Sequence, residues 1–308
     1  ERAANADMYV TLEPCNHRGR TAPCSHAVAS SGIKRVIVGM RDPNPLVDGA
    51  GVDYLQKCGV EVVCGVLERE CRDINKPFIK YITSSLPWVI MKAGLSLDGR
   101  LNYQGGAGGK ITGDESFKKV HRLRNSVDAI LVGSGTVAAD DPSLTTRLPH
   151  GRGRNPVRIV LDSQLAIREN AQILDVDMER QTWVFCSETV NPEKIQRLTD
   201  RGISVIPTTP GMDNKINLED VVKFSAGQEI TTLLVEGGAT IHGAFLQQRL
   251  IDYAYLFYAP IFAGDGGVSL ISGLQVNGGR NKAIKLSGVK TRRYGEDWLV
   301  QGDVVYPD

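Results

Sequence analysis

The chain has 308 residues, of which 42% are hydrophobic and 23% charged, so its length and composition are those of a folded protein of about two domains. With a net charge of +1 and no apolar run near the roughly 20 residues that span a bilayer, we expect neither a nucleic acid nor a membrane as partner. Six cysteines are too few for a disulfide scaffold, which favours a reducing, cytoplasmic location.

The first part of the chain alternates between short apolar runs and helical patterns. The apolar runs predict strands at residues 8–12, 35–40 and 61–66. The patterns between them predict helices at residues 24–31 and 51–57. A charged stretch, residues 68–85, predicts one long helix that ends before Pro87. We therefore place a domain boundary there, between residues 1–85 and 86–308.

The second part alternates in the same way. Strands are predicted at residues 88–93, 129–133, 157–162, 182–186, 204–207 and 232–235, and helices at residues 114–125, 192–201 and 241–249. Strands that alternate with helices predict an α/β fold with an open, mostly parallel sheet in both domains. Residues 253–261 and 298–306 are strand-like and flank glycine-rich loops, which predicts antiparallel strands at a sheet edge.

Two cysteines of the first domain suggest a metal site. Cys15 follows Glu13-Pro14 after the first predicted strand, and Cys24 opens the next predicted helix nine positions later. Two thiolates that leave a loop and enter a helix can hold Zn²⁺. The spacing is wider than the Cys-x-x-Cys of zinc deaminases, so two unrelated cysteines remain an alternative.

The residues around these cysteines resemble a known family. The run TLEPCNHRGRTAPC (residues 11–24) and the later DPNP (residues 42–45) closely resemble the zinc signature of the pyrimidine deaminases of riboflavin biosynthesis. The resemblance implies a cytidine-deaminase-like three-layer domain in which Cys15 and Cys24 bind Zn²⁺. It also implies substrate contacts from His17, Arg20 and Asn44, for which a polar loop residue is an equal alternative.

The family's deaminases also use a His-x-Glu segment. Its histidine is the third zinc ligand, and its glutamate moves protons between the zinc-bound water and the leaving amine. The printed sequence has no His-x-Glu. We therefore expect either that this segment lies upstream of Glu1 or that the deaminase is inactive.

Six further blocks resemble the reductase half of the same bifunctional family. They are KAGLSLDGR (92–100), KITG (110–113), RLR (122–124), GTVAADDPSLTTR (135–147), RIVLDS (158–163) and VEGG (235–238). The resemblance implies a dihydrofolate-reductase-like domain that binds NADPH. It places the cofactor at Gly94, Lys110, Thr136, Asp140, Ser163, Gly238, Ala239, Thr240, Ile241, His242, Gly243 and Ala244, and the substrate at Gly108, Arg124, Leu144, Arg147 and Glu236.

Two charged residues end apolar strands and are the candidate catalytic pair. Lys92 follows residues 88–91, and Glu236 follows residues 232–235. Opposite charges at strand ends of one sheet can meet across a cleft and shift each other's pKa. The resemblance places them near the ribose carbon that accepts hydride, whereas the structural alternative is that they only hold two strands together.

Arginines and glycines complete the predicted site. Arg124 and Arg147 carry planar forks that suit the substrate's ribose phosphate, although Arg124 also fits an exposed helix charge. Gly237-Gly238 between a strand and a helix would let backbone amides approach a phosphate, or form a tight turn without a ligand. Glycine-rich stretches at residues 105–109 and 264–267 are expected to form mobile loops beside the cleft.

The resemblance implies two consecutive reactions on phosphoribosylaminopyrimidines. The first is hydrolytic deamination of 2,5-diamino-6-(5-phosphoribosylamino)pyrimidin-4(3H)-one. The second is NADPH-dependent reduction of the ribosyl group of 5-amino-6-(5-phosphoribosylamino)uracil to ribityl. A reductase with a vestigial zinc domain is the alternative, and a nucleic-acid-binding module on a deaminase scaffold is disfavoured by the low net charge. We also expect a homo-oligomer, because apolar strands near the C-terminus can pair between subunits.

Overall fold

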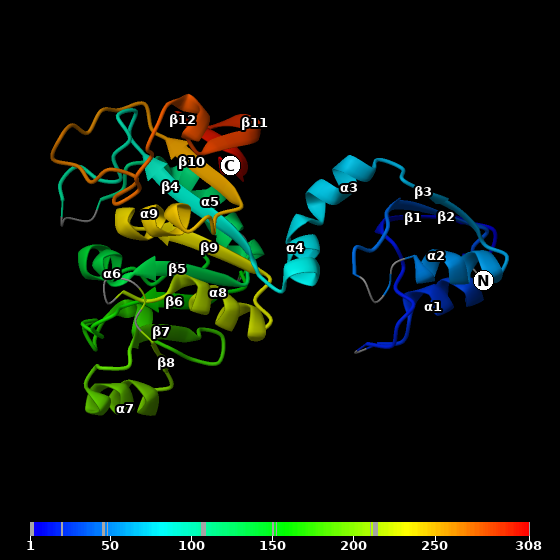
Figure 1. Cartoon of the computed structure of the whole chain (residues 1–308), viewed down its shortest axis with the longest axis horizontal. Helices are drawn as coiled ribbons and strands as arrows, with labels where there is room; N and C mark the ends of the chain where they lie inside the picture. The colour runs from blue at the N-terminus through cyan, green and yellow to red at the C-terminus, as the bar shows by residue number, and fades with distance from the viewer. Residues whose placement is uncertain are drawn as a thin grey trace. The chain divides into compact units, whose positions relative to one another are not determined.

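Figure 1 shows the computed structural model, which describes residues 3–19, 21–44, 47, 49–105, 109–149, 151, 153–209, 211 and 215–307. The chain divides into two compact units, Glu1–Leu86 and Pro87–Asp308, next to the boundary expected after residue 85. Both units alternate strands with helices, so the predicted α/β class is confirmed. Within the described residues, no helix has the length and apolarity that a membrane span requires.

The first unit is built on a parallel sheet of order β1-β2-β3. Its elements are β1 (Asp7–Leu12), α1 (Cys24–Ser30), β2 (Arg35–Met40), α2 (Ala50–Lys57) and β3 (Glu61–Cys64). Val28 of α1 and Leu55 of α2 pack on Val36 and Val38, which share one face of β2. The Cys71 side chain lies against Gly39 on the other face. This sheet is therefore covered by α1 and α2 on one face, whereas Tyr9 and Val63 of the other face are 72% and 40% exposed.

The long helix predicted over residues 68–85 is wrong. The structure has two helices there, α3 (Glu68–Ile74) and α4 (Lys76–Ser84). Asn75 separates them, and its side-chain amide donates a 2.8 Å hydrogen bond to the Cys71 carbonyl of α3. Pro77 lies in the first turn of α4, where its missing N–H is tolerated, whereas inside a continuous helix it would leave a carbonyl unpaired.

The second unit contains one large sheet. In the described part of the chain its strands are β4 (Trp88–Leu95), β5 (Ala129–Gly133), β6 (Val157–Leu161), β7 (Thr182–Ser187), β8 (Ser204–Thr208), β9 (Thr232–Gly237), β10 (Tyr253–Tyr258), β11 (Lys285–Tyr294) and β12 (Asp297–Val305). Their order is β11-β12-β10-β4-β9-β5-β6-β7-β8. All neighbours from β10 to β8 are parallel, and β11 and β12 form an antiparallel pair at one edge. The predicted antiparallel arrangement of the two C-terminal strands is confirmed, because β10 pairs with β12 in antiparallel. On its other side β10 pairs with β4 in parallel, so β11 and not β10 lies at the edge of the sheet.

Helices lie on both faces of this sheet (Figure 1). They are α5 (Asp114–Ser126), α6 (Ser134–Asp140), α7 (Pro192–Asp200), α8 (Leu218–Gly227) and α9 (Ala239–Gln247), with short 3-10 turns η1 (Gln172–Leu174) and η3 (Arg280–Lys282). On one face, Ile130 and Val132 of β5 share a core cluster with Leu123 of α5. On the other face, Phe224 of α8 contacts Phe185 of β7 with ring centroids 5.5 Å apart.

The strand order fixes where a ligand is expected to bind. After β4 the chain adds β5, β6, β7 and β8 in turn toward one edge, and then returns to insert β9 between β4 and β5. The direction of chain progression reverses there, and open α/β sheets bind ligands at the carboxyl ends of strands beside such a reversal. The carboxyl ends of β5, β6 and β9 therefore mark the candidate site.

Arg158 of β6 is a buried cation inside this unit. Arg158 is 1% exposed, and its guanidinium donates hydrogen bonds to the carbonyl oxygens of Ser143, Asp175 and Arg180 at 3.2, 2.8 and 3.2 Å. Burial and, to a smaller extent, the charge of the nearby Arg180 lower its pKa to about 10. The side chain thus ties three loop segments to the sheet through their backbone.

Replacing Arg158 with methionine is expected to destabilise the second unit by about 3 kcal/mol, because several buried carbonyls lose donors at about 1 kcal/mol each. Urea unfolding of Arg158→Met and wild type measures the difference. Arg168→Met removes an exposed arginine from the loop after the same strand and is expected to change stability by less than about 0.5 kcal/mol. Equal stabilities for the two variants would contradict this role of Arg158.

Candidate active site

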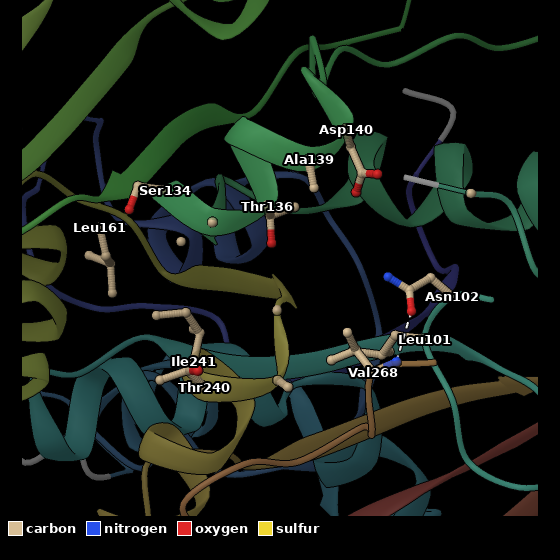
Figure 2. A pocket seen from close by; sticks show the side chains of 15 residues that line it. Leu101, Asn102, Ser134, Thr136, Ala139, Asp140, Leu161, Thr240, Ile241 and Val268 are labelled. Atoms are coloured by element: carbon tan, nitrogen blue, oxygen red, sulfur yellow. Dashed lines mark hydrogen bonds between the residues drawn. The ribbon is translucent and has the colours of Figure 1, made fainter. Parts of the chain in front are cut away.

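A cavity of about 470 Å³ lies at the carboxyl ends of β5, β6 and β9. It is lined by Leu101, Asn102, Gly109, Gly133, Ser134, Gly135, Thr136, Ala139, Asp140, Leu161, Gly238, Ala239, Thr240, Ile241 and Val268. Figure 2 shows the residues of α6 on one side and the first residues of α9 on the opposite side. This volume is in the range of small-molecule and cofactor sites.

Two loops close the remaining side of the cavity. The Leu101 N–H donates to the Val268 carbonyl at 2.8 Å, and the Val268 N–H donates to Asn102 Oδ1 at 2.8 Å (Figure 2). The Asp98 carboxylate accepts from the N–H groups of Ala263 and Gly264 at 2.9 and 2.8 Å. Hydrogen bonds from Ser96 and from these amides lower the pKa of Asp98 to about 2. The described parts of the two glycine-rich stretches are thus cross-linked to each other.

A buried charge cluster lies at the end of β9. The Glu236 side chain is 6% exposed and accepts hydrogen bonds from Arg124 Nε and Nη2, both at 2.8 Å. Lys92 Nζ of β4 lies 3.6 Å from Glu236 Oε2. The structure thus brings the predicted pair together and adds Arg124 from α5 to it. Gly238 of the cavity wall follows Glu236 by two residues, so cluster and cavity share one strand end.

The charges in this cluster determine the protonation of Glu236. Burial opposes ionisation, but the charges of Arg124 and Lys92 outweigh it and lower the pKa of Glu236 to about 2. Burial likewise opposes the charge of Arg124, while Glu236 holds the net pKa of that guanidinium above its ordinary value. At neutral pH Glu236 is therefore a carboxylate and not a proton donor, and the Nε edge of Arg124 is already occupied.

His121 and Arg147 lie next to this cluster. His121 of α5 is 1% exposed, and its Nδ1 accepts a 3.0 Å hydrogen bond from the Arg147 backbone N–H. Burial, together with the charges of Arg124 and Arg147, lowers the pKa of His121 to about 4. The Arg147 guanidinium lies 5.5 Å from the ring centre of Phe117 and is exposed.

The predicted cofactor residues fall into two groups. Those that line the cavity are Thr136, Asp140, Gly238, Ala239, Thr240 and Ile241, and those that do not are Gly94, Lys110, Ser163, His242, Gly243 and Ala244. The His242 ring is fully buried, with Nδ1 3.3 Å from the Leu270 carbonyl oxygen. A Cβ on Gly243 would lie 1.9 Å from the Ser272 carbonyl oxygen, so this glycine permits packing. Lys110 is exposed and pairs with Asp114.

Part of the cavity wall was not predicted from the sequence. The missed residues are Leu101, Asn102, Gly133, Ser134, Gly135, Ala139, Leu161 and Val268, whereas Gly109 belongs to the glycine-rich stretch expected beside the cleft. Gly133 is the last residue of one predicted strand and Leu161 the last but one of another, so the rule on carboxyl ends would have found them. Of the predicted substrate residues, Leu144 is buried with φ +50°, and Gly108 and Arg20 lie outside the described residues.

In the first unit the two predicted zinc ligands lie together. The Cys24 N–H donates to Cys15 Sγ at 3.4 Å, and a hydrogen bond to Cys15 raises the pKa of the Cys24 thiol. Among the described residues, no group of three or more His, Cys, Asp or Glu side chains is placed to hold a metal ion. The two cysteines are therefore neighbours, but the described residues place no third ligand beside them.

Glu13 of the Glu-Pro-Cys block has a structural role. Its carboxylate is buried and accepts from the N–H groups of Asp42, Gly51 and Val52 at 3.1, 2.9 and 3.0 Å. Glu13 therefore joins the loop after β2 and the start of α2 to the loop that carries Cys15. Asn44 belongs to the same loop, where its N–H donates to Asp42 Oδ1 at 2.9 Å.

Comparison with known proteins gives consistent matches. Residues 87–300 match the family model described as the RibD C-terminal domain. The chain is 40% identical over 272 residues to the riboflavin biosynthesis protein RibD of Bacillus amyloliquefaciens, covering 88% of this chain and 72% of that protein. It is 38% identical over 300 residues to RibD of Aquifex aeolicus, covering 97% of this chain and 81% of that protein.

Two solved structures superpose on nearly the whole of this chain. RibD of Acinetobacter baumannii superposes with a TM-score of 0.85 at 30% identity, covering 99% of this chain and 82% of that one. A diaminohydroxyphosphoribosylaminopyrimidine deaminase/5-amino-6-(5-phosphoribosylamino)uracil reductase from Thermotoga maritima gives a TM-score of 0.80 at 33% identity, covering 99% and 80%. The predicted dihydrofolate-reductase-like fold of the second unit is confirmed by these matches.

The stability of the second unit is expected to depend on pH through Glu236. Because its folded pKa is about 2 against an ordinary value of 4.5, the carboxylate contributes stability that is fully present above pH 4.5 and is lost toward pH 2. The difference in melting temperature between wild type and Glu236→Gln should therefore be largest at neutral pH and shrink across that window.

Thermal unfolding from neutral pH to pH 2 measures this difference. Glu296→Gln, which changes an exposed glutamate, is expected to follow wild type at every pH. A Glu236→Gln difference that stays constant down to pH 2 is incompatible with the assigned charge state.

Proposed function

This chain belongs to the RibD family of riboflavin biosynthesis proteins, and on that premise we propose that its second unit reduces the ribosyl group of 5-amino-6-(5-phosphoribosylamino)uracil to ribityl with NADPH. The observation that carries the proposal is the cavity at the ends of β5, β6 and β9, which shares the end of β9 with the Lys92–Glu236–Arg124 cluster. One strand end thereby offers both a cofactor site and charged groups for the substrate.

The glycines of the cavity support a dinucleotide there. NADPH supplies a hydride when it is bound. A Cβ on Gly133 would lie 2.9 Å from Ile241 Cγ1, and a Cβ on Gly238 would lie 3.3 Å from Thr136 Oγ1. Glycine at these positions keeps the backbone accessible between α6 and α9. The N-terminal N–H groups of the nine-residue α9 are suited to a cofactor phosphate.

The environment of Asp162 favours NADPH over NADH. An acidic residue at the end of the corresponding strand typically binds the free ribose hydroxyl of NADH. Here the Asp162 carboxylate is buried and accepts a 2.7 Å hydrogen bond from the Ile167 N–H, so it is engaged inside its own loop. Ser163 and the exposed Arg168 are left to contact the 2′-phosphate of NADPH.

The charged residues divide the work on the substrate. Arg147 has an exposed guanidinium and is assigned to the ribose phosphate, whereas Arg124 contributes mainly by holding Glu236. Ring opening of the ribosylamine gives a C1′=N bond, whose carbon accepts the hydride and whose nitrogen takes up the proton as the π bond breaks. Lys92 Nζ is the donor assigned to that step, and the ionised Glu236, 3.6 Å away, keeps it oriented.

A second candidate function concerns the first unit. Its sulfur pair, Cys15 and Cys24, supports a zinc-dependent, cytidine-deaminase-like domain that deaminates 2,5-diamino-6-(5-phosphoribosylamino)pyrimidin-4(3H)-one. Zinc supplies an activated water when it is bound. The proposal also needs a histidine ligand and a catalytic glutamate from a His-x-Glu segment. The printed sequence contains no His-x-Glu. The competing proposal is a reductase whose zinc domain is vestigial.

Replacing Lys92 with methionine is expected to lower kcat by about 10²-fold and to leave NADPH binding nearly unchanged, because a positioned proton donor is lost. Single-turnover rates and thermal melts on the same preparation measure both effects, with Lys118→Met on the exposed face of α5 as control. If Lys92 only held two strands together, the melting temperature would fall while kcat per folded molecule stayed at the wild-type value.

The cofactor assignment predicts a preference for NADPH of about 10²-fold or more in kcat/KM. Arg168→Ala is expected to raise the KM for NADPH about tenfold and leave the KM for NADH unchanged, since only NADPH carries the 2′-phosphate. Steady-state kinetics with both cofactors tests it. Comparable efficiencies of wild type with NADH and NADPH would rule out the assignment.

The zinc proposal predicts metal content. The natural protein is expected to carry Zn²⁺ that is lost in Cys15→Ala and Cys24→Ala, because each removes a thiolate ligand. Elemental analysis of purified protein measures it, and Cys58→Ala, which changes an exposed cysteine outside the pair, is expected to keep the metal. Equal zinc in wild type and Cys15→Ala would remove Cys15 from the site.

A further inference from the structure

His121 is a buried histidine beside the charge cluster to which the mechanism above gives no task. It lies on α5, one turn before Arg124 and one turn after Phe117, so the three side chains share a face of the helix. Its Nδ1 accepts a 3.0 Å hydrogen bond from the Arg147 backbone N–H. This bond joins α5 to a loop 26 residues further along the chain.

The hydrogen bond determines the form of the imidazole. A ring nitrogen that accepts an N–H carries no proton, so in neutral His121 the proton is on Nε2. Nε2 is buried and has no hydrogen-bond partner among the described residues. Burial and two neighbouring arginines lower the pKa of His121 to about 4, so the acceptor is present at neutral pH.

The same face of α5 also holds the Arg147 side chain. The guanidinium lies 5.5 Å from the ring centre of Phe117, and the Phe117 ring meets the His121 ring edge-on with centroids 4.4 Å apart. Arg124 Nη1 donates to the Thr145 carbonyl at 3.4 Å, which holds the loop two residues earlier. Backbone and side chain of Arg147 are thus fixed by neighbouring residues of one helix, while its charge stays exposed.

We propose that His121 is a positioning residue that holds Arg147 in the orientation needed to bind the phosphate of a ribose 5-phosphate group. The inference rests on the proposed function for the identity of the substrate, but the binding step stands by itself. An arginine fork gains affinity for phosphate when its orientation is fixed beforehand. The cost of the arrangement is a buried imidazole with one unpartnered nitrogen, and the gain is a preorganised anchor.

The test measures binding of ribose 5-phosphate to the whole chain by calorimetry at neutral pH. His121→Leu removes the acceptor and is expected to weaken binding about tenfold. His121→Asn places its Oδ1 close to the position of Nδ1 and should restore affinity to within about threefold, whereas His121→Gln places its amide near Nε2 and should not. Thermal melts select a temperature at which every variant is folded.

A double-mutant cycle separates positioning from general packing. The cycle combines Arg147→Ala with either His121→Asn or His121→Gln. If His121 acts through Arg147, both double variants bind ribose 5-phosphate as weakly as Arg147→Ala alone. A further loss in the His121→Gln double variant, or equal affinities of the Asn and Gln single variants, would overturn the inference. The Asn–Gln comparison decides the matter even if His121→Leu does not fold.

The experiment also separates this inference from the proposed function. Suppose that the wild type and the variants bind ribose 5-phosphate as expected, but the wild type does not reduce 5-amino-6-(5-phosphoribosylamino)uracil. This result supports the positioning role and contradicts the proposed function. Wild type that reduces the substrate while Arg147→Ala binds ribose 5-phosphate normally defeats the positioning role alone. Absence of binding to wild type at millimolar concentration also overturns it.

Discussion

The Glu236 carboxylate is buried between two cations, and the arrangement of the second unit around it follows from that placement. A lone carboxylate at this depth would take up a proton, but the double hydrogen bond from Arg124 and the approach of Lys92 keep it ionised. These partners come from α5 and β4, so the ion pairs join the helix layer to two strands of the sheet. Removal of Glu236 would leave the two cations facing each other without an anion, whereas removal of either cation leaves the carboxylate with one remaining partner.

The strand order explains why this cluster lies beside a cavity. Because β9 is inserted between β4 and β5, its end is flanked by parallel neighbours whose carboxyl ends lie at the same edge. Helices α6 and α9 begin there, and Gly133 and Gly238 keep their first turns close to the sheet. The Asn102–Val268 contact closes the remaining side. Charge and cavity are therefore consequences of one topological reversal.

Much of the fold was predictable because the signals are local. The strands β2 and β5 agree with the apolar runs residue for residue, since buried parallel strands are continuous apolar segments. The break at Asn75 was not predicted, because the charged residues of 68–85 indicate one continuous helix and Pro77 was not taken as the start of a second one. The parallel pairing of β10 with β4 was not predicted, because composition does not report which neighbour a strand pairs with. The polar, exposed β11 carries no apolar run and was not predicted.

The site was only partly predictable for a related reason. Lys92 and Glu236 stand out as charges at the ends of apolar runs, and the structure places them 3.6 Å apart. The bond from Arg147 to His121 and the loop wall at Val268 join residues far apart in sequence, and no short motif reports them. The pairing of Arg124 with Glu236 is equally long-range.

The most direct test of the account follows the hydride. Wild-type protein is mixed with 5-amino-6-(5-phosphoribosylamino)uracil and NADPH that carries deuterium on one face of nicotinamide C4, and then with NADPH labelled on the other face. A nicotinamide held in one orientation beside Lys92 predicts that deuterium from only one of the two cofactors appears at C1′ of the ribityl product. An unreduced substrate, or deuterium at C1′ from both cofactors, would contradict the account.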